Sequence, residues 1–169
     1  GLADLATLGS VTESTREPRQ DIEIFLRLIQ AHQLPELRRH LSQTLMRQGL
    51  QRFVIDTIAP LNHSVGEAWM RGEFAIFEEH LYTEQVHSVL RNAVGSMQPQ
   101  GRAPRVLLTT FPNEPHSLGL LMLEALLVVE GAACVPLGTE TPLAEIARAA
   151  DAHRVDIVAL SFSFAFNVK

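Results

Sequence analysis

The stretch RVLLTTFPNEPHSLGLLMLEALLVVEGAACVPL, residues 105–137, decides the fold of this chain. It opens with a short apolar run, 106–108, that predicts a strand buried on both faces. A helix is expected over about 116–130, and Gly131 caps its C-terminal end. The run 132–137 predicts a second strand. A strand, a helix and a strand in this order predict two parallel strands joined by a right-handed crossover.

The same alternation continues toward the C-terminus. Pro142 opens a further helix that runs to about Ala152, and residues 155–162 predict a third strand. Parallel sheets of this kind bind ligands beyond the carboxyl ends of their strands. That edge is predicted to carry residues 109–119, 138–141 and 161–164. Because three strands are only about half of an ordinary doubly wound domain, the sheet is expected to continue beyond Lys169.

Upstream of the strands, the apolar residues recur at helical spacing instead. Helices are expected over 20–32, 35–49, 53–69 and about 76–97. Pro60 is expected to kink or split the third helix. The residues of the fourth helix that are predicted to face inward are Leu81, Val86, Val89, Leu90 and Val94. Four helices joined by short loops predict a bundle.

The expected fold class is therefore α plus α/β. It consists of a four-helix bundle over residues 19–98 and a flavodoxin-like, Rossmann-type parallel sheet over residues 104–169, truncated at its C-terminus. The polar run QPQGRAP, residues 98–104, is interpreted as the connection between them. Residues 1–18 are small, polar and charged, and they are interpreted as a linker from a domain that precedes them.

Composition and charge narrow the classes of protein to which this chain can belong. Hydrophobic residues make up 46% and charged residues 20%, which predicts a folded core rather than a disordered tail. The net charge is −5 and the 14 Lys and Arg are scattered, so the basic stripe of a nucleic-acid surface is absent. The single cysteine, Cys134, fits a reducing cytoplasm. No apolar run is long enough for a membrane span.

A histidine follows the first predicted strand, at the edge where such a sheet binds ligands. His116 lies two residues after Glu114. A neutral imidazole ligates a metal through one nitrogen, and a carboxylate on the other nitrogen selects the tautomer and raises the basicity. Gly119 would let the backbone approach a bulky ligand closely. A lone histidine in a loop is more often a surface residue, so spacing alone leaves both interpretations open.

The run Glu114-x-His116-x-x-Gly119 resembles the Asp-x-His-x-x-Gly signature of base-off/His-on cobalamin-binding domains. This resemblance implies that His116 is the lower axial ligand of cobalt and that the acidic residue hydrogen-bonds it. Ser117, within the same run, is then expected to lie in the cofactor site. Glu114 stands where aspartate is usual, and its longer side chain either shifts this hydrogen bond or routes it through water.

The next element of that family, Ser-x-Leu after the third strand, falls at Ser161 to Ser163. Ser161 matches the pattern, whereas Ser163 stands at the leucine position. Both are expected to belong to the cofactor site by this resemblance. The Gly-Gly element that follows in the family lies beyond Lys169, the last residue of the chain.

A second pattern lies in WMRGEFAIFEEH, residues 69–80. Read alone, it is a core tryptophan followed by a solvated helix start that the helix dipole favours. Yet a tryptophan followed after nine residues by Glu-His resembles the cap motif of light-responsive, adenosylcobalamin-dependent regulators of the MerR type. The resemblance implies that Trp69 and Ile76 shape the space for the adenosyl group. It also implies that Glu79 hydrogen-bonds the ribose and that His80 contributes to the upper face.

One position departs from that family. The residue after the tryptophan is a histidine in its light sensors, where it can ligate cobalt after photolysis, and here it is Met70. A bis-histidine adduct through this position is therefore not available, which leaves His63, His80 or water as the expected alternatives. Surface or helix-lining roles are the expectation for the histidines outside the two motifs, which are His32, His40, His63, His87 and His153.

These residues together predict a cytoplasmic sensor rather than an enzyme. It binds adenosylcobalamin, assembles as a homo-oligomer and holds a DNA-binding domain, located before Gly1, on its operator. Light then breaks the cobalt–carbon bond and releases the adenosyl group. The dark state loses its contacts with that group, and the oligomer loosens. The alternative is a corrinoid methyl carrier of a methyltransferase system, for which a ribose-binding carboxylate at Glu79 has less use. A flavodoxin-like module without a cofactor is the third interpretation.

Overall fold

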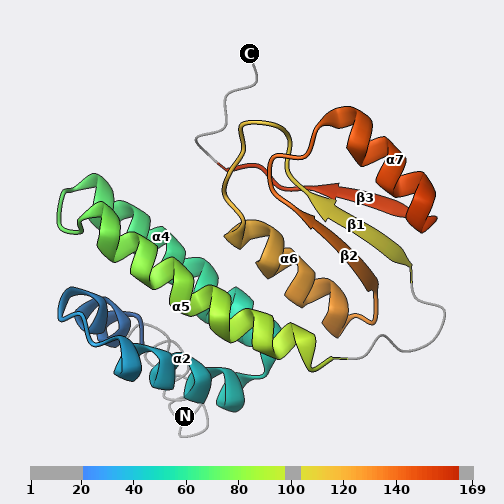
Figure 1. Cartoon of the computed structure of the whole chain (residues 1–169). Helices are drawn as coiled ribbons and strands as arrows, with labels where there is room; N and C mark the ends of the chain where they lie inside the picture. The colour runs from blue at the N-terminus through green and yellow to red at the C-terminus, as the bar shows by residue number, and fades with distance from the viewer. Residues whose placement is uncertain (1–20, 98–103, 164–169) are drawn as a thin grey trace, which may run out of the picture. The chain divides into compact units, whose positions relative to one another are not determined.

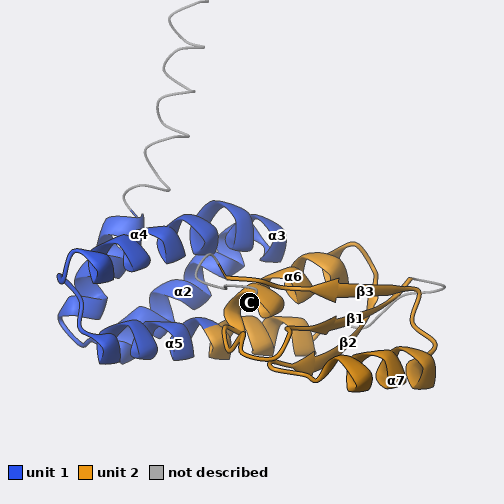
Figure 2. Cartoon of the chain, turned by 90° about the horizontal axis from the view of Figure 1, so that it is seen from above, with its two compact units in different colours: residues 1–86 blue, residues 87–169 orange. Residues whose placement is uncertain are grey.

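The computed structural model describes residues 21–97 and 104–163, and Figure 1 shows the order of their helices and strands. By its contacts the chain divides into two compact units, residues 1–86 and 87–169, which Figure 2 colours separately. The predicted linker at 1–18 lies outside the described residues, as does most of the predicted connection between bundle and sheet.

Four helical segments make up the N-terminal part of the chain. Residues 21–30 are helical, and they are followed by α2 (Leu34–Gln48), α3 (Leu50–Arg52), the π-helical turn η1 (Phe53–Ile58), α4 (Ala59–Met70) and α5 (Ile76–Gly95). Because α3, η1 and α4 follow one another without a break, they form one helical segment. The predicted four-helix bundle is confirmed, and α5 contributes residues to both compact units.

The predicted stop at Gly49 and the predicted interruption at Pro60 take different forms. Gly49 has a φ of 77° and its N–H donates to the carbonyl of Leu45, which ends α2 as expected. Pro60 lies in the first turn of α4, and the backbone stays helical on both sides of it. The helix is therefore not split. Its geometry changes from α to π in η1, just before the proline that cannot donate to the preceding turn.

The apolar stripe of α2 differs from the sequence pattern at one position. Leu37, Leu41 and Thr44 are fully buried and recur at steps of four and three residues. Met46 is apolar and was expected to face the core with Leu37 and Leu41, but it is 84% exposed because it lies on the opposite side of the helix. The other fully buried large side chains of the first unit are Phe25, Phe53, Ile58, Leu61 and Tyr82.

The second unit contains a three-stranded parallel sheet. Its elements are β1 (Arg105–Thr109), α6 (Leu118–Val129), β2 (Ala133–Gly138), α7 (Leu143–His153) and β3 (Ile157–Leu160). The strand order is β2-β1-β3, with β1 parallel to both neighbours. Figure 2 shows α6 and α7 on opposite faces of the sheet. The predicted Rossmann-type alternation is confirmed, although α6 begins two residues after His116 rather than at it.

Burial within the sheet follows the strand order. The central strand β1 has Val106, Leu107 and Leu108 at most 1% exposed, as predicted for a strand buried on both faces. In contrast, Ile157 and Val158 of β3 are 50% and 41% exposed, since β3 is an edge strand among the described residues. In residues 21–97 and 104–163, no helix combines the length and the apolar character needed to cross a membrane.

Candidate functional site

The loop between β1 and α6 carries the predicted histidine at the carboxyl edge of the sheet. Asn113 has a φ of 69°, a left-handed conformation that asparagine tolerates, and it turns the chain just before Glu114. The N–H of Glu114 donates to the carbonyl of Phe111 at 3.1 Å and closes this turn. The tight turn places Glu114 and His116 beyond the end of the central strand.

Glu114 is the buried centre of the loop, because its side chain is only 1% exposed. Its Oε1 accepts hydrogen bonds from the backbone N–H of His116 at 3.1 Å and from the ring Nδ1 at 2.6 Å. Its Oε2 accepts from the backbone N–H of Ser163 at 2.7 Å and from the Ser163 hydroxyl at 2.8 Å. The predicted bond between Glu114 and His116 is therefore direct and not routed through water.

These hydrogen bonds determine the protonation state of the Glu114 carboxyl group. Burial by itself raises the pKa of Glu114, but the bonds from Ser163 and His116 outweigh this and lower the pKa to about 2. An ionised carboxylate only accepts hydrogen bonds, so Nδ1 of His116 carries the ring proton. The lone pair of a neutral imidazole then lies on Nε2. Because the His116 side chain is 63% exposed, this nitrogen is accessible to a metal from outside.

A cluster of threonines supports the loop from the side of β2. The hydroxyl of Thr110 donates to the carbonyl of Glu114 at 2.6 Å and accepts from the N–H of Glu140 at 2.8 Å. The hydroxyl of Thr109 bonds the carbonyl of Gly138 at 2.9 Å. Because both threonines are fully buried, these bonds tie the loop after β1 to the loop after β2.

Gly119 and Ser161 approach each other closely. A Cβ placed on Gly119 would lie 2.8 Å from the Ser161 hydroxyl oxygen, which is closer than such contacts occur. The described neighbour that Gly119 approaches is therefore the Ser161 side chain just after β3, whereas the sequence suggested a bulky ligand. Ser163 rather than Ser161 bonds Glu114. The two departures from the family pattern, Glu114 and Ser163, thus contact each other.

The turn between α4 and α5 carries the second group of predicted residues. The N–H of Gly72 bonds the carbonyl of Trp69, and the N–H of Glu73 bonds that of Ala68, both at 2.9 Å, which is a Schellman ending. Gly72 has the φ of 71° that this ending requires. The Arg71 guanidinium bonds both carboxylate oxygens of Glu73, at 2.7 and 3.0 Å. The position of Trp69 at the end of α4 is thus well defined.

Trp69 is not a core residue, contrary to one of the two interpretations of its pattern. It is 49% exposed and Ile76 is 63% exposed, whereas Phe74 and Tyr82 fill the core nearby. The Tyr82 hydroxyl donates to the side-chain oxygen of Asn62 and joins α4 to α5. Met70 and Phe77, the chain neighbours of Trp69 and Ile76, are exposed as well, and a group of exposed apolar side chains is a feature of binding surfaces.

Glu78 and Glu79 have different roles at the start of α5. Glu78 accepts from the N–H of Ala75 at 2.7 Å and caps the helix. Glu79 is not needed for capping. Its Oε1 accepts from the Thr83 hydroxyl at 2.9 Å, and its Oε2 lies 3.1 Å from Nδ1 of His80. Since Glu79 is 37% exposed and His80 is 72% exposed, both side chains are accessible to a ligand.

The donor set has the chemistry that cobalamin requires of a protein. Among residues 21–97 and 104–163, no three His, Cys, Asp or Glu side chains are grouped so that they could hold a metal ion. A single oriented imidazole suits a metal whose other ligands come from a macrocycle, as cobalt has in a corrin ring. The His116 and Glu114 pair fits this role.

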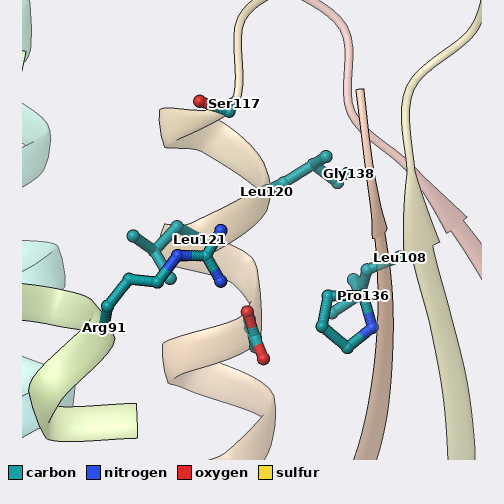
Figure 3. Close-up of a pocket in the computed structure, with 8 residues that line it drawn as sticks. Arg91, Leu108, Ser117, Leu120, Leu121, Pro136 and Gly138 are labelled. Atoms are coloured by element: carbon teal, nitrogen blue, oxygen red, sulfur yellow. The ribbon is translucent and has the colours of Figure 1, made fainter. Parts of the chain in front are cut away.

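A small pocket lies beside this site but is not the site itself. It is lined by Arg91 of α5, by α6 and by the ends of β1 and β2 (Figure 3). Its volume of about 20 Å³ has room for one or two water molecules and not for a corrin ring. His116 and Glu114 are not among its lining residues.

The N-terminal helices match a known family. A family model described as "B12 binding domain" aligns with residues 22–93. The match covers less than half of the chain and lies within its helical part. The matched residues cover most of the helical bundle and include Trp69, Ile76, Glu79 and His80. Glu114 and His116 lie beyond the matched residues, in the parallel-sheet unit.

Two curated relatives are repressors of transcription. The HTH-type transcriptional repressor CarH of Myxococcus xanthus is 30% identical over 159 residues, which is 94% of this chain and 53% of that protein. The HTH-type transcriptional repressor CarA of the same organism is 34% identical over 87 residues, 52% of this chain and 30% of that protein. The chain thus spans about half the length of the first relative and less than a third of the second.

Two solved structures are among the matches to this chain. A cobalamin-binding protein from Desulfitobacterium hafniense has a TM-score of 0.41 at 16% identity, covering 85% of this chain and 69% of that one. The methanol:cobalamin methyltransferase complex from Methanosarcina barkeri has a TM-score of 0.43 at 13% identity, covering 83% and 55%. Likenesses of this strength do not distinguish a regulator from a carrier.

The structure groups the predicted residues into separate sets. Glu114, His116 and Ser163 form one hydrogen-bonded set, and Gly119 contacts Ser161. Trp69, Ile76, Glu79 and His80 lie in the other compact unit, among the residues that match the family model. Ser117 bonds a residue that sequence reasoning left aside, His87 of α5, at 3.2 Å. The four-residue spacing of Glu79, Thr83 and His87 places them on one face of α5, but it does not identify Ser117 as the partner.

Proposed function

We propose that this chain is the cobalamin-binding sensor region of a transcriptional regulator, with His116 as the lower ligand of cobalt. The observation that carries this proposal is the buried Glu114 carboxylate, which holds the proton on Nδ1 of His116 and leaves Nε2 as the ligating atom. The match of residues 22–93 to the B12 binding domain supports the choice of cobalamin. The repressor relatives support the choice of a regulator over an enzyme.

Adenosylcobalamin is the form of the cofactor that we propose. The exposed apolar side chains of Trp69 and Ile76 are suited to pack against the adenine of the adenosyl group. Glu79, which has no capping role, is suited to accept hydrogen bonds from the ribose hydroxyls, and His80 lies beside it. Methylcobalamin has neither adenine nor ribose, so these residues would favour the adenosyl form over the methyl form.

We further propose that light is the signal. When bound, adenosylcobalamin supplies a cobalt–carbon bond that visible light breaks. Trp69, Ile76 and Glu79 then lose the group they contact, and the helical bundle changes to the state that these contacts had disfavoured. Met70 is 73% exposed and supplies a thioether where the light sensors of the family have an imidazole. It therefore cannot provide the second histidine of a bis-histidine adduct.

The regulatory output that we propose is a change of assembly and of DNA binding. The chain carries a net charge of −5, which does not favour contact with the phosphate backbone. A DNA-binding domain in the part of the protein before Gly1 would make that contact. A homo-oligomer held together in the dark would raise its affinity for a two-part operator, because linked modules bind with a high effective concentration.

The experiment that tests this function is an absorption spectrum of the 169-residue chain purified with adenosylcobalamin in darkness, repeated after green light. Size-exclusion chromatography follows in both states. We expect a bound, histidine-ligated spectrum that changes on illumination, together with a change in oligomer size. Tight binding of methylcobalamin with no light-dependent change in assembly would instead indicate the methyl carrier. Absence of any cobalamin binding would contradict both functions.

Two substitutions test the proposed adenosyl contacts. Glu79→Gln removes a charged acceptor and Trp69→Ala removes a large apolar surface, so each is expected to weaken adenosylcobalamin binding about tenfold or more. Affinity for methylcobalamin is expected to change less than about twofold. Titration with the two cofactors in darkness, followed by absorbance, measures both constants.

Glu84→Gln is the matched control for Glu79. It changes an exposed glutamate of the same helix, α5, and is expected to leave both affinities unchanged. If Glu79→Gln and Trp69→Ala keep the wild-type preference for adenosylcobalamin, these residues do not recognise the adenosyl group.

A further inference from the structure

The hydroxyl of Ser117 has an unusual partner. Serine at the start of a helix ordinarily accepts a hydrogen bond from the N–H groups of that helix. Ser117 directly precedes α6, yet its side chain makes no capping bond and its backbone is already helical, with φ −90° and ψ −19°. Its hydroxyl oxygen lies instead 3.2 Å from Nε2 of His87 on α5.

His87 belongs to a polar row along α5. Glu79, Thr83 and His87 are spaced by four residues and follow one face of the helix over about 12 Å. Within the row, Thr83 donates to Glu79. At its far end, His87 reaches the serine that follows His116 in the sequence. His87, the part of this row that belongs to the second compact unit, therefore contacts the loop with the proposed cobalt ligand.

The His116 loop is thus held from two directions. Ser163, after β3, bonds Glu114, which in turn orients the imidazole ring. His87 bonds Ser117, which shares a peptide bond with His116. Figure 3 shows Ser117 at the start of α6 and Arg91, one turn beyond His87, extending from α5 toward α6 around the small pocket.

We propose that His87 is a positioning residue for the cobalt ligand, acting through Ser117 on the backbone of His116. This inference rests on the proposed function and goes beyond it, because it assigns to His87 of α5 an indirect role in positioning the lower ligand. Loss of the bond would leave the ring oriented by Glu114 while the start of α6 gains freedom. The fraction of cobalamin bound through His116 would then fall.

The test uses His87→Leu, Ser117→Ala and the double variant in the full chain. Each single change is expected to weaken cobalamin binding about fivefold, the usual effect of one hydrogen bond. It is also expected to lower the fraction of histidine-ligated cofactor in the absorption spectrum. The double variant should be no weaker than either single variant, because both remove the same bond. Additive losses would mean that His87 does not act through Ser117.

His87→Gln is the rescue variant. Its amide can both donate to and accept from the serine hydroxyl, so it is expected to retain at least half of the wild-type affinity and the histidine-ligated spectrum. If glutamine fails in the same way as leucine while the leucine variant remains folded, the bond to Ser117 is not what His87 contributes.

Amide hydrogen exchange in the cofactor-free chain separates this inference from the proposed function. His87→Leu is expected to speed exchange at the start of α6, around residues 117–121, several-fold, and His87→Gln is expected to preserve the wild-type rates. Unchanged exchange in the leucine variant would overturn the positioning role even if cobalamin binds. Absence of cobalamin binding by the wild-type chain would overturn the proposed function and, with it, the role toward cobalt.

Discussion

Replacing His116 with alanine is expected to lower the affinity of the chain for cobalamin about 100-fold or more and to abolish the histidine-ligated spectrum. Changes to groups that only orient a metal ligand typically cost 10- to 100-fold, so removal of the ligand itself should cost at least as much. The imidazole is 63% exposed and makes one side-chain bond to Glu114. Loss of that bond should lower the free energy of unfolding by only about 1 kcal/mol.

His153→Ala is the matched control for this substitution. His153 ends α7 in the same compact unit and is also exposed, so its removal should change neither the affinity nor the spectrum. Titration of each variant with cobalamin and a chemical unfolding curve without cofactor separate binding from stability. A His116→Ala chain that binds cobalamin like the wild type, with the same spectrum, would show that another group is the axial ligand.

Glu114→Gln is expected to have the largest effect on stability, with a loss of about 2–3 kcal/mol in the free energy of unfolding. The carboxylate accepts backbone N–H groups on both sides, from His116 on one oxygen and from Ser163 on the other. An amide has one oxygen and one NH₂ group. Whichever way it turns, its NH₂ group faces a buried N–H that cannot accept a hydrogen bond.

The same substitution should weaken cobalamin binding about 10- to 100-fold. If the NH₂ group faces His116, the ring nitrogen Nδ1 has to accept, and the proton moves to Nε2. That tautomer has no lone pair on the nitrogen that is proposed to bind cobalt. If the NH₂ group faces Ser163 instead, the hydrogen bond from the Ser163 N–H is lost, and the loop after β3 is no longer bonded to residue 114 through it. Both arrangements therefore reduce the population of a competent ligand.

The pH dependence of stability gives an independent measurement of the Glu114 site. The pKa of Glu114 is lowered to about 2 in the folded chain, from an ordinary value of 4.5. A lowered pKa means that the stabilisation is complete above about pH 4.5 and is lost as the pH falls toward about 2. This contribution is about 3 kcal/mol. Denaturant unfolding of the wild type between pH 6 and pH 3 should show the decline, and Glu114→Gln should lack it.

Glu124→Gln is the matched control for Glu114→Gln. Glu124 is also a buried carboxyl of the same unit, 8% exposed, but desolvation by burial raises its pKa despite the nearby Arg91. Because burial disfavours its charged form, a neutral glutamine should cost less than about 1 kcal/mol there. If the two variants lose the same free energy of unfolding, the hydrogen bonds of Glu114 do not contribute to stability.

The sequence by itself determined the features that depend on neighbours along the chain. Gly49 and Gly131 end their helices as predicted, since a left-handed residue after a helix is a local requirement that glycine meets. The alternation of apolar strands and helices over 105–160 was sufficient to predict a parallel sheet, because consecutive parallel strands need a crossover. Glu114 and His116 are two residues apart, so the sequence was also sufficient to predict their hydrogen bond.

Only the tertiary structure decided which distant residues complete the site. Ser163 is 49 residues from Glu114, and the family pattern pointed to Ser161 as the matching serine instead. His87 is 30 residues from Ser117, and its pattern gave a helix-lining role without a partner. Trp69 and Tyr82 are both aromatic residues of the bundle helices, yet Tyr82 is buried and Trp69 is exposed. Composition and periodicity describe one helix or strand at a time, whereas these contacts depend on the packing of one element against another.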